Sequence, residues 1–388
     1  MTSAIDRVLQ QPVAAGALPG VVGLAANDGG IFYQGAFGRR RVDAPDPMTL
    51  DTVFRIASMT KAITATAAMQ LVEAGRIGLE QPIGEIAPEI AQVQVLEGFD
   101  TNGQPKLRAP NRPVTLRHLL THTSGYSYDI FNADVGRYFE VTGLPSVMTC
   151  KSASLRAPLV FDPGERWEYG IGIDWVGKIV EAVSGRDLEA YFQENIFGPL
   201  GMKDSTFRPS EAQHERLVGT HARQPDGKVA PIEFAVPEDA EFLMGGGGLY
   251  STGPDNLAYT RMILNGGELN GVRVLKPETV ALMGQNHIGA IEVPMLKSAN
   301  PALAREVDFF PGMVKKWGLS FLINTEEAPT GRAAGSLAWA GIHNTFFWID
   351  PTKRVAAVLM MQLLPANDEV VLTTLAGFEQ AIYQGLRQ

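Results

Sequence analysis

The sequence has one cysteine, few charged residues and no long hydrophobic run, and each scarcity excludes a class of protein. Cys150 is the only cysteine among 388 residues, so an internal disulfide and a zinc cluster built from thiolates are both excluded. Charged side chains make up 19% of the chain and hydrophobic ones 45%, which is enough for a core and argues against disorder. No run approaches the roughly 18 apolar residues that a membrane helix needs, so no membrane partner is expected.

Positive charge is also scarce. The formal net charge of −9 argues against nucleic acid or an anionic membrane as a partner, and the only tight basic run, GRRRVD, is interpreted as a solvated turn. The first residues, MTSAIDRVLQQPVAAG, include an acid and a base and lack a long apolar core, so they do not resemble a signal peptide. A cytoplasmic location is therefore expected, while nothing in the sequence indicates an oligomeric state.

Two widespread hydrolase motifs are absent. No serine lies in a Gly-x-Ser-x-Gly elbow, which excludes an α/β-hydrolase. The six histidines are scattered and form no His-Glu-x-x-His, so neither a metal site nor another cofactor is expected. His122, in LLTHTSG, is interpreted as a packed or capping residue.

Strand patterns occupy the two ends of the chain, and helix patterns occupy the middle. A helix near residues 5–14 precedes two strands, GVVGLAAND and GGIFYQGAFGRR, which meet at a turn. Beyond Gly312 the predicted elements are the strands KWGLSFLINT, AAGSLAWAG, NTFFWIDP and RVAAVLMMQLL and a last helix, EVVLTTLAGFEQAIYQGL. The sequence thus predicts an α+β fold in which both termini build one antiparallel sheet flanked by helices, with a large helical insertion.

The predicted domain division follows from this pattern. Residues 1–54 and 210–388 would form a discontinuous sheet domain, and residues 55–209 a mostly helical insertion domain, with a cleft where the two meet. The GGGG run at 245–248 lacks the strand and helix context of a nucleotide-binding loop, so it is interpreted as a structural loop where chains pass closely.

The stretch FRIASMTKAITATAAMQLVEAG contains a single charged side chain between Ser58 and Val72, which is Lys61. The segment is typical of a helix buried on nearly all sides, where a lone ammonium is costly unless it is used or paired. Ser58 lies three residues before Lys61, on the same helix face. A nucleophilic serine needs a nearby base, and a lysine among apolar neighbours can serve. A Ser-x-x-Lys pattern arises about once by chance in a chain of this length, so the pattern alone is weak evidence. The alternative interpretation is a helix cap followed by a lysine whose amine reaches solvent, and the apolar setting of the segment disfavours it.

Five motifs, taken in order, carry a resemblance to a known family: FRIASMTKAITA, LLTHTSG, FDPGERWEYG, GGGGLYSTGPD and WAGIHNTFFWIDP. From Gly20 to the last helix the chain resembles the serine β-lactamase-like family, which comprises class C β-lactamases, D-alanyl-D-alanine peptidases and family VIII carboxylesterases. The resemblance implies that Ser58 is the acylated nucleophile, Lys61 its partner and Tyr169 the tyrosine of the second motif. The backbone N–H groups of Ser58 and Ile342 would hold the oxyanion.

Two departures from the family pattern bear on the substrate. Ile171 stands where the lactamases and peptidases have the asparagine of Tyr-x-Asn, and Trp339 stands where they have the lysine of Lys-Thr-Gly, two residues before Gly341. An amide contact and a carboxylate contact are both missing, which favours an ester with a largely apolar acyl part. Trp339, Gly341, Tyr128 and His343 are the candidate substrate-binding residues.

The sequence therefore predicts a serine carboxylesterase that hydrolyses short-acyl esters of small molecules through an acyl-enzyme, without a cofactor. Lys61, coupled to Tyr169, would take the proton of Ser58, and Tyr169 would protonate the leaving alcohol. One alternative is an acyltransferase of the same fold. A β-lactamase or D-amino-acid peptidase is disfavoured by the two departures, and a non-catalytic binding protein by the presence of all three catalytic residues.

Overall fold

The centre of the computed structural model, which describes residues 1–234, 236–237 and 239–387, is a seven-stranded antiparallel sheet. The strand order β11-β12-β13-β14-β15-β1-β2 places the first strands of the chain beside the last. Leu24 of β1 faces Val358 of β15, for example. The predicted α+β class is confirmed. The seven strands are β1 (Gly20–Asn27), β2 (Gly30–Gly38), β11 (Lys315–Trp317), β12 (Leu322–Asn324), β13 (Leu337–Gly341), β14 (Thr345–Asp350) and β15 (Val355–Met360).

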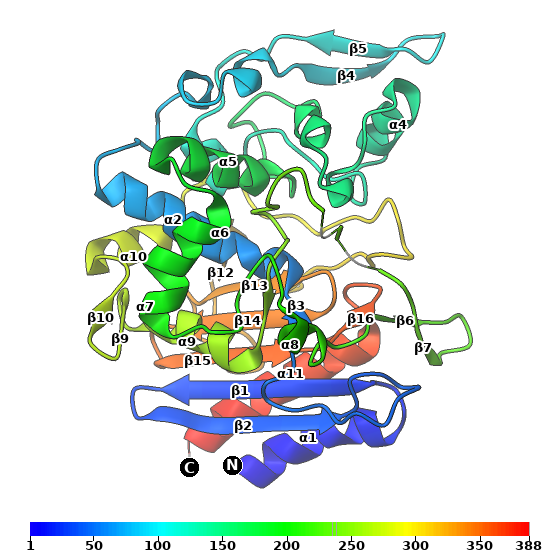
Figure 1. Ribbon diagram of the computed structural model, residues 1–388, viewed down its shortest axis with the longest axis vertical. Helices are drawn as coiled ribbons and strands as arrows, with labels where there is room; N and C mark the ends of the chain where they lie inside the picture. Colours follow the sequence, from blue (N-terminus) through cyan, green and yellow to red (C-terminus); the bar gives the residue numbers. More distant parts are fainter. Residues whose placement is uncertain (235, 238, 388) are drawn as a thin grey trace.

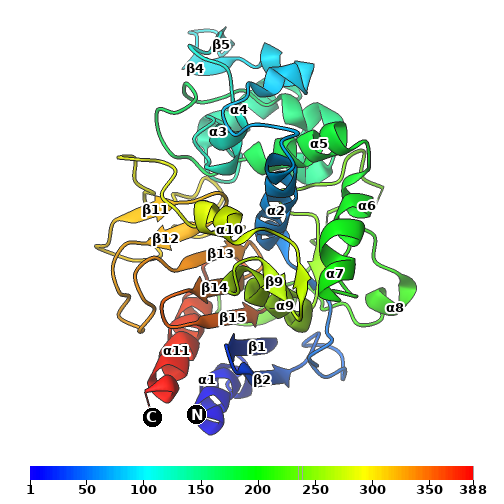
Figure 2. The same ribbon diagram turned by 90° about the vertical axis from the view of Figure 1, so that its left-hand side faces the viewer.

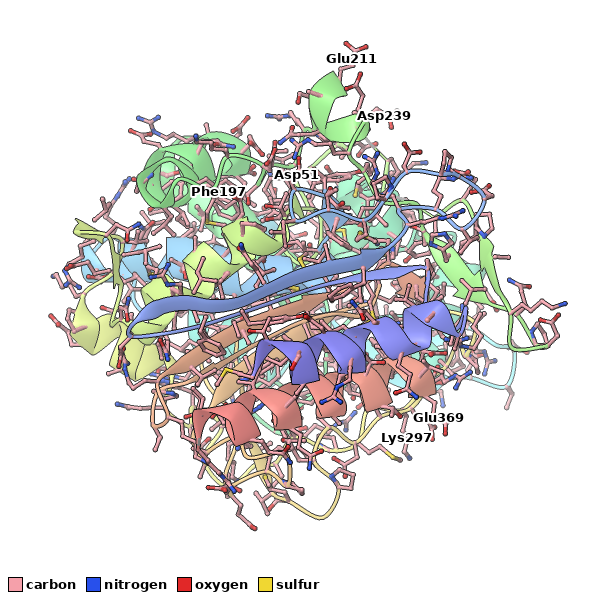
Figure 3. All side chains as sticks on the ribbon, turned by 90° about the horizontal axis from the view of Figure 1, so that it is seen from below. Asp51, Phe197, Glu211, Asp239, Lys297 and Glu369 are labelled. Carbon is pink, nitrogen blue, oxygen red and sulfur yellow. The ribbon has the colours of Figure 1, made fainter. Side chains whose placement is uncertain are left out.

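Helices cover both faces of the sheet because its central strands are apolar on both sides. Helices α1 (Thr2–Ala14) and α11 (Glu369–Leu386) lie next to each other on one face (Figure 3). Helices α2 (Thr60–Glu73) and α9 (Gly253–Leu264) are on the other. All six residues of β15 are buried, and alternate ones join the hydrophobic cores of the two faces. The continuous apolar run of this strand is what a strand buried on both faces requires.

Helices α3 (Leu116–Leu120), α4 (Ala133–Thr142) and α5 (Gly172–Ser184), from the middle of the chain, gather toward the end of the molecule away from the termini (Figure 1 and Figure 2). Helices α6 (Leu188–Phe192) and α7 (Gly198–Leu200) lead back from there to the level of the sheet (Figure 1). Helix α2 runs between the first three helices and the sheet (Figure 2). None of the helices in the described part of the chain is long and apolar enough to cross a membrane. The division into domains 1–54 with 210–388 and 55–209 stays a prediction.

Short strands and helices complete the fold around this frame. The strand β3 (Phe54–Arg55) leads into α2 and pairs with β8 (Tyr250–Ser251), which leads into α9. The hairpin of β4 and β5, which the sequence did not predict, lies at the far end of the helical part (Figure 1). The remaining elements are β4 (Val95–Phe99), β5 (Pro105–Arg108), β6 (His221–Arg223), β7 (Val229–Pro231), β9 (Glu268–Leu269), β10 (Val272–Arg273), β16 (Leu363–Leu364), α8 (Glu211–His214) and α10 (Pro277–Met283).

One predicted strand is wrong. KWGLSFLINT forms two antiparallel strands, β11 and β12, joined by a tight connection. A Cβ at Gly318 would collide with the carbonyl oxygen of Met283, and Ser320 has a φ of 75°. The backbone must therefore turn where the apolar pattern alone suggests continuity, because this segment packs directly on the C-terminal end of α10.

Candidate active site

Lys61 lies in the first turn of α2, and its side chain is fully buried. The Nζ atom donates to Ser58 Oγ at 3.2 Å, to the Tyr128 hydroxyl at 2.9 Å and to the carbonyl oxygen of Gly246 at 2.5 Å. An ammonium group has three N–H donors, so every one of them is used. The lone charge that the sequence placed in an apolar helix is thus satisfied by three polar partners, which is the condition for burying it.

Ser58 lies in a 3-10 turn, Ala57–Met59, that joins β3 to α2. The end of β13 packs on this turn so closely that a Cβ at Gly341 would collide with the carbonyl oxygen of Ile56. The glycine therefore allows the following residue, Ile342, to line the same pocket as Ser58. The role of the two backbone N–H groups as an oxyanion hole stays a prediction.

Two tyrosines flank Lys61. Tyr128, in the loop between α3 and α4, meets Nζ through its hydroxyl, and burial, together with the nearby charge of Asp174, raises its pKa well above the ordinary value. Tyr169, just before α5, meets Nζ through its ring face, with the centroid 4.7 Å away. The Tyr169 hydroxyl instead accepts a hydrogen bond of 3.0 Å from Trp339 Nε1. The hydroxyl contact of Lys61 therefore goes to Tyr128, a contact that spacing did not reveal.

Trp339 both lines the pocket and donates a hydrogen bond to Tyr169. Its indole lies 4.9 Å from the Tyr169 ring and 4.6 Å from the Trp317 ring, and it lines the pocket above Ser58. Because its N–H holds the Tyr169 hydroxyl, the residue that replaces the lysine of the third motif also positions the tyrosine of the second.

His122 is packed, as expected, and supports Tyr169 from behind. Its ring centroid is 4.8 Å from that of Tyr169, and Nδ1 accepts the backbone N–H of Gly170 at 3.4 Å. Burial, with a smaller contribution from the charge of Lys61, holds the His122 pKa well below the usual value, so the ring stays neutral.

Asp174, in the first turn of α5, is a site residue that the sequence analysis missed. Its side chain is fully buried, and Oδ1 accepts the backbone N–H of Gly246 at 2.8 Å. Burial raises the Asp174 pKa to about 6, against the opposing effects of the Lys61 charge and the Gly246 N–H. The signal was available, because a lone acid in the apolar stretch GIDWVG is as costly as a lone lysine in α2.

Residues 245–248 form a loop where chains pass closely, as predicted, and the loop also belongs to the site. Gly246 connects the two buried charges, since its N–H binds Asp174 and its carbonyl oxygen binds Lys61. A Cβ at Gly246 would collide with the carboxylate of Asp174, so glycine is required for this approach. Gly247 and Gly248 line the pocket beside Ser58.

A pocket opens at Ser58 and is lined mainly by apolar side chains. All of the predicted site residues except Lys61 line it, and Lys61 reaches Ser58 from inside the core. Among the described residues, no group of three His, Cys, Asp or Glu side chains could hold a metal ion. The apolar lining comprises Ala57, Ile130, Phe131, Met148, Phe234, Val236, Met244, Leu249, Leu296, Phe309, Trp339, Ala340, Ile342 and Ala366.

The chain is similar to known proteins over nearly its whole length. The model of the Beta-lactamase family matches residues 5–381. The monacolin J acid methylbutanoyltransferase of Aspergillus terreus is 33% identical over 405 residues, which cover 99% of this chain and 96% of that protein. The lovastatin esterase of Penicillium rubens is 32% identical, with 98% of each chain covered.

Solved structures agree with these relatives. Unliganded simvastatin synthase (LovD) from Aspergillus terreus superposes with a TM-score of 0.86 at 31% identity, covering 100% of this chain and 99% of that one. EstCE1, described as a hydrolase with promiscuous acyltransferase activity, superposes with a TM-score of 0.79 at 23% identity, with 98% of each chain covered. At that identity the likeness to EstCE1 shows the shared fold alone.

Proposed function

Because the chain belongs to the Beta-lactamase family, we propose that it is a serine acyltransferase, which takes an acyl group from an ester onto Ser58 and passes it to an alcohol. The observation that carries the proposal is the fully buried Lys61, with Nζ 3.2 Å from Ser58 Oγ at the base of an apolar pocket. The sequence alone favoured an esterase and kept transfer as the alternative. The acyltransferases among the relatives now favour transfer.

Acylation uses the contacts around Lys61. For acylation Lys61 acts as the neutral amine. Two N–H groups still donate to the Tyr128 hydroxyl and the Gly246 carbonyl, and the lone pair takes the place of the third N–H, which points to Ser58 Oγ in the ammonium form. Ser58 Oγ attacks the ester carbonyl as its proton passes to Nζ, and the backbone N–H groups of Ser58 and Ile342 stabilise the oxyanion. The proton held at Nζ is then available for the second half of the reaction.

Tyr169 acts on the leaving and the incoming oxygen. Its phenolic oxygen accepts from Trp339 Nε1, which leaves its own proton free to be donated into the pocket. During acylation Tyr169 protonates the leaving alcohol as the ester C–O bond breaks. During deacylation the deprotonated Tyr169 takes the proton of the incoming alcohol. The same group can serve both steps because deacylation by an alcohol is acylation run backwards.

The acceptor is proposed to carry a carboxylate. The names of two relatives describe transfer of a methylbutanoyl group to an acid or a carboxylate, monacolin J acid and ML-236A carboxylate. By analogy, the acceptor of this chain would be an alcohol that also bears a carboxylate and whose apolar body fills the pocket.

A second candidate function is hydrolysis of the same acyl-enzyme. The lovastatin esterase at 32% identity favours it, and the chemistry differs only in whether water or an alcohol attacks Ser58-bound acyl. The partition between the two is measurable as the ratio of transfer product to free acid at increasing alcohol concentration. A ratio that stays near zero at saturating alcohol would identify the enzyme as an esterase.

The first test is the nucleophile. Ser58→Ala is expected to abolish both transfer and hydrolysis with p-nitrophenyl butyrate as the donor, while the fold is kept because one small side chain replaces another. Ser3→Ala, at an exposed position of α1, is the matched control and should keep full activity. Labelling with a serine-reactive phosphonate and peptide mass mapping should find the adduct on Ser58, and an adduct on another serine would overturn the proposal.

A further inference from the structure

The fully buried carboxylate of Asp174 takes no part in the proposed steps at Ser58. It lies in the first turn of α5, and it does not line the pocket above the serine. Oδ1 accepts the N–H of Gly246, but Oδ2 has no hydrogen-bond partner in the described part of the chain. A buried carboxylate with one unsatisfied oxygen costs free energy of folding, so stability does not explain why this acid is there.

The peptide group that precedes Gly246 is held on both sides. Its carbonyl oxygen accepts a hydrogen bond of 2.7 Å from Thr64 Oγ1, and its N–H donates one of 2.8 Å to Asp174. The next carbonyl oxygen, that of Gly246 itself, accepts from Lys61 Nζ at 2.5 Å. Because α2 supplies Thr64 and Lys61 and α5 supplies the acid, these bonds tie both helices to one short segment. Asp174 therefore helps to fix the carbonyl that holds the amine beside Ser58.

Asp174 and Lys61 are also opposite charges in the core, on the two sides of Gly246. Helix α5 packs on α2, α3 and α6, and among the described residues of these helices the charge that acts on Asp174 is that of Lys61. The Asp174 charge also acts on Tyr128 and Cys150, but burial is the larger cause that raises the pKa of each, that of Cys150 to about 12. Both groups stay neutral from about pH 5 to pH 9, so the lysine and the carboxylate interact as the charged pair.

A negative charge near the amine has two opposing effects on acylation. It stabilises the ammonium form of Lys61, so the neutral amine that takes the Ser58 proton forms only at higher pH. It also stabilises the positive charge that develops on Nζ as that proton is transferred, which makes the step itself faster. The carboxylate thus lowers activity at low pH and raises it at high pH.

We propose that Asp174 positions the catalytic base: through the Gly246 peptide it holds Lys61 Nζ against the serine, and its charge sets the pH range in which the amine takes the serine proton. The inference rests on the proposed function, in which Ser58 is the nucleophile and Lys61 the base. Because Asp174 lies outside the pocket, its removal should change the rate of acylation and the pH dependence of that rate, and not the affinity for the ester.

The test is the pH profile of acylation, followed by stopped-flow release of p-nitrophenol from p-nitrophenyl butyrate between about pH 5 and pH 9. Asp174→Asn keeps an oxygen for the Gly246 N–H but removes the charge. Its rate should be about threefold lower than that of the wild type at high pH and about threefold higher near pH 7, because the acid limb moves down by about one pH unit. The profiles should therefore cross. They should converge below about pH 6, where the wild-type carboxylate is protonated, since burial raises the Asp174 pKa to about 6.

Asp255→Asn is the matched control. Asp255 of α9 is also buried, and burial likewise raises its pKa to about 6, but it accepts from Ser205 Oγ and from the backbone N–H of Asp204 and not from the site. The substitution should leave the shape of the profile unchanged. Asp174→Ala, a second variant, lacks both the charge and the oxygen, and it should show the same displacement of the acid limb with a further loss of about fivefold at every pH.

A rate that differs from the wild type by one constant factor at every pH, in both Asp174 variants, would overturn the inference, because loss of structure alone lowers the rate without moving the acid limb. The two proposals fail separately. Crossing profiles together with an acyl-enzyme that only water attacks would contradict acyl transfer and leave the role of Asp174 intact. Transfer to an alcohol with parallel profiles would contradict only the role of Asp174.

Discussion

The loop after α3 and the loop before α5 each bring a tyrosine to Lys61, but the two hydroxyls have different partners. The Tyr128 hydroxyl accepts from Nζ, whereas the Tyr169 hydroxyl accepts from Trp339 and only its ring face meets Nζ. Both side chains are nearly fully buried, so exposure does not distinguish them. Their partners do. The Tyr128 hydroxyl is one of the hydrogen-bond partners of Lys61. The Tyr169 hydroxyl has no such bond to Lys61, so we expect it to act on the oxygen of the leaving or the incoming alcohol.

Under the proposed mechanism, this difference gives the two tyrosines different catalytic roles. A group bonded to the base influences every step in which the base moves a proton, whatever the substrate. A group aimed at the leaving oxygen matters most when that oxygen is a poor leaving group. The two tyrosines should therefore separate in experiments that vary the leaving group, even though they are within 5.3 Å of each other, ring centroid to ring centroid.

The largest effect is expected from removing the group that both tyrosines serve. Lys61→Ala should lower the acylation rate by about three to four orders of magnitude, because the proton of Ser58 then lacks a base. Adding Tyr128→Phe should cost little more, since residues that act as one unit are not additive. Stopped-flow release of p-nitrophenol measures both, with Lys106→Ala at an exposed position as the matched control. Near-normal acylation in Lys61→Ala would make the lysine merely structural.

Tyr169→Phe and Tyr128→Phe should then differ in how their effect on kcat/KM depends on the leaving group. Tyr169→Phe is expected to lower kcat/KM by about two to three orders of magnitude for an ethyl ester and much less for a p-nitrophenyl ester, whose leaving group needs no proton. Tyr128→Phe should cost about tenfold for both esters, since it perturbs the base only. A series of esters with leaving groups of graded acidity gives, for each variant, the slope of log kcat/KM against the pKa of the leaving alcohol. Equal slopes would remove the distinction between the tyrosines.

Sequence reasoning found the local part of the site and missed the part that tertiary structure assembles. Ser58 and Lys61 are three residues apart on one helical face, so spacing alone brings them together. Tyr128 is 67 residues from Lys61, and Trp339 is 170 residues from Tyr169, so no pattern could show those hydrogen bonds. Motif matching brought the same residues to one pocket, but it could not assign hydroxyl partners.

The fold shows the same limit. The strands β1, β14 and β15 were predictable because their apolar runs are buried on both faces. The hairpin of β4 and β5 was missed because few of its residues are buried, so it carries no strong hydrophobic pattern. The division of KWGLSFLINT into β11 and β12 depends on a close contact of Gly318 with a distant segment, which leaves no trace in local hydrophobicity.

The buried carboxyl group of Asp174 makes the stability of the protein depend on pH. Its folded pKa of about 6 lies above the ordinary value of 3.8, so between these pH values the folded state binds more protons than the unfolded state. The stability of the protein is therefore reduced as pH rises through this window, and Asp174→Asn removes that loss. The unfolding free energy of the variant relative to the wild type should rise by about 2.4 kcal/mol from pH 4 to pH 7.

Denaturant unfolding at several pH values measures how the difference in unfolding free energy between variant and wild type changes with pH. Asp239→Asn, at an exposed carboxylate on the surface (Figure 3), is the matched control and should show no comparable change. A difference between Asp174→Asn and the wild type that does not vary with pH would mean that the carboxylate titrates alike in the folded and unfolded states.

The smallest effect, and the sharpest test of the division of labour, is expected from Trp339→Phe. Phenylalanine keeps an aromatic wall in the pocket but removes the N–H that holds the Tyr169 hydroxyl at 3.0 Å. The loss of one hydrogen bond to a neutral group is worth about 1 kcal/mol, or roughly fivefold in rate. It should appear with the ethyl ester, should be small with the p-nitrophenyl ester, and should vanish when Tyr169→Phe is already present. A Trp339→Phe effect that is the same for both esters and survives in the Tyr169→Phe background would show that the indole acts through substrate packing and not through Tyr169.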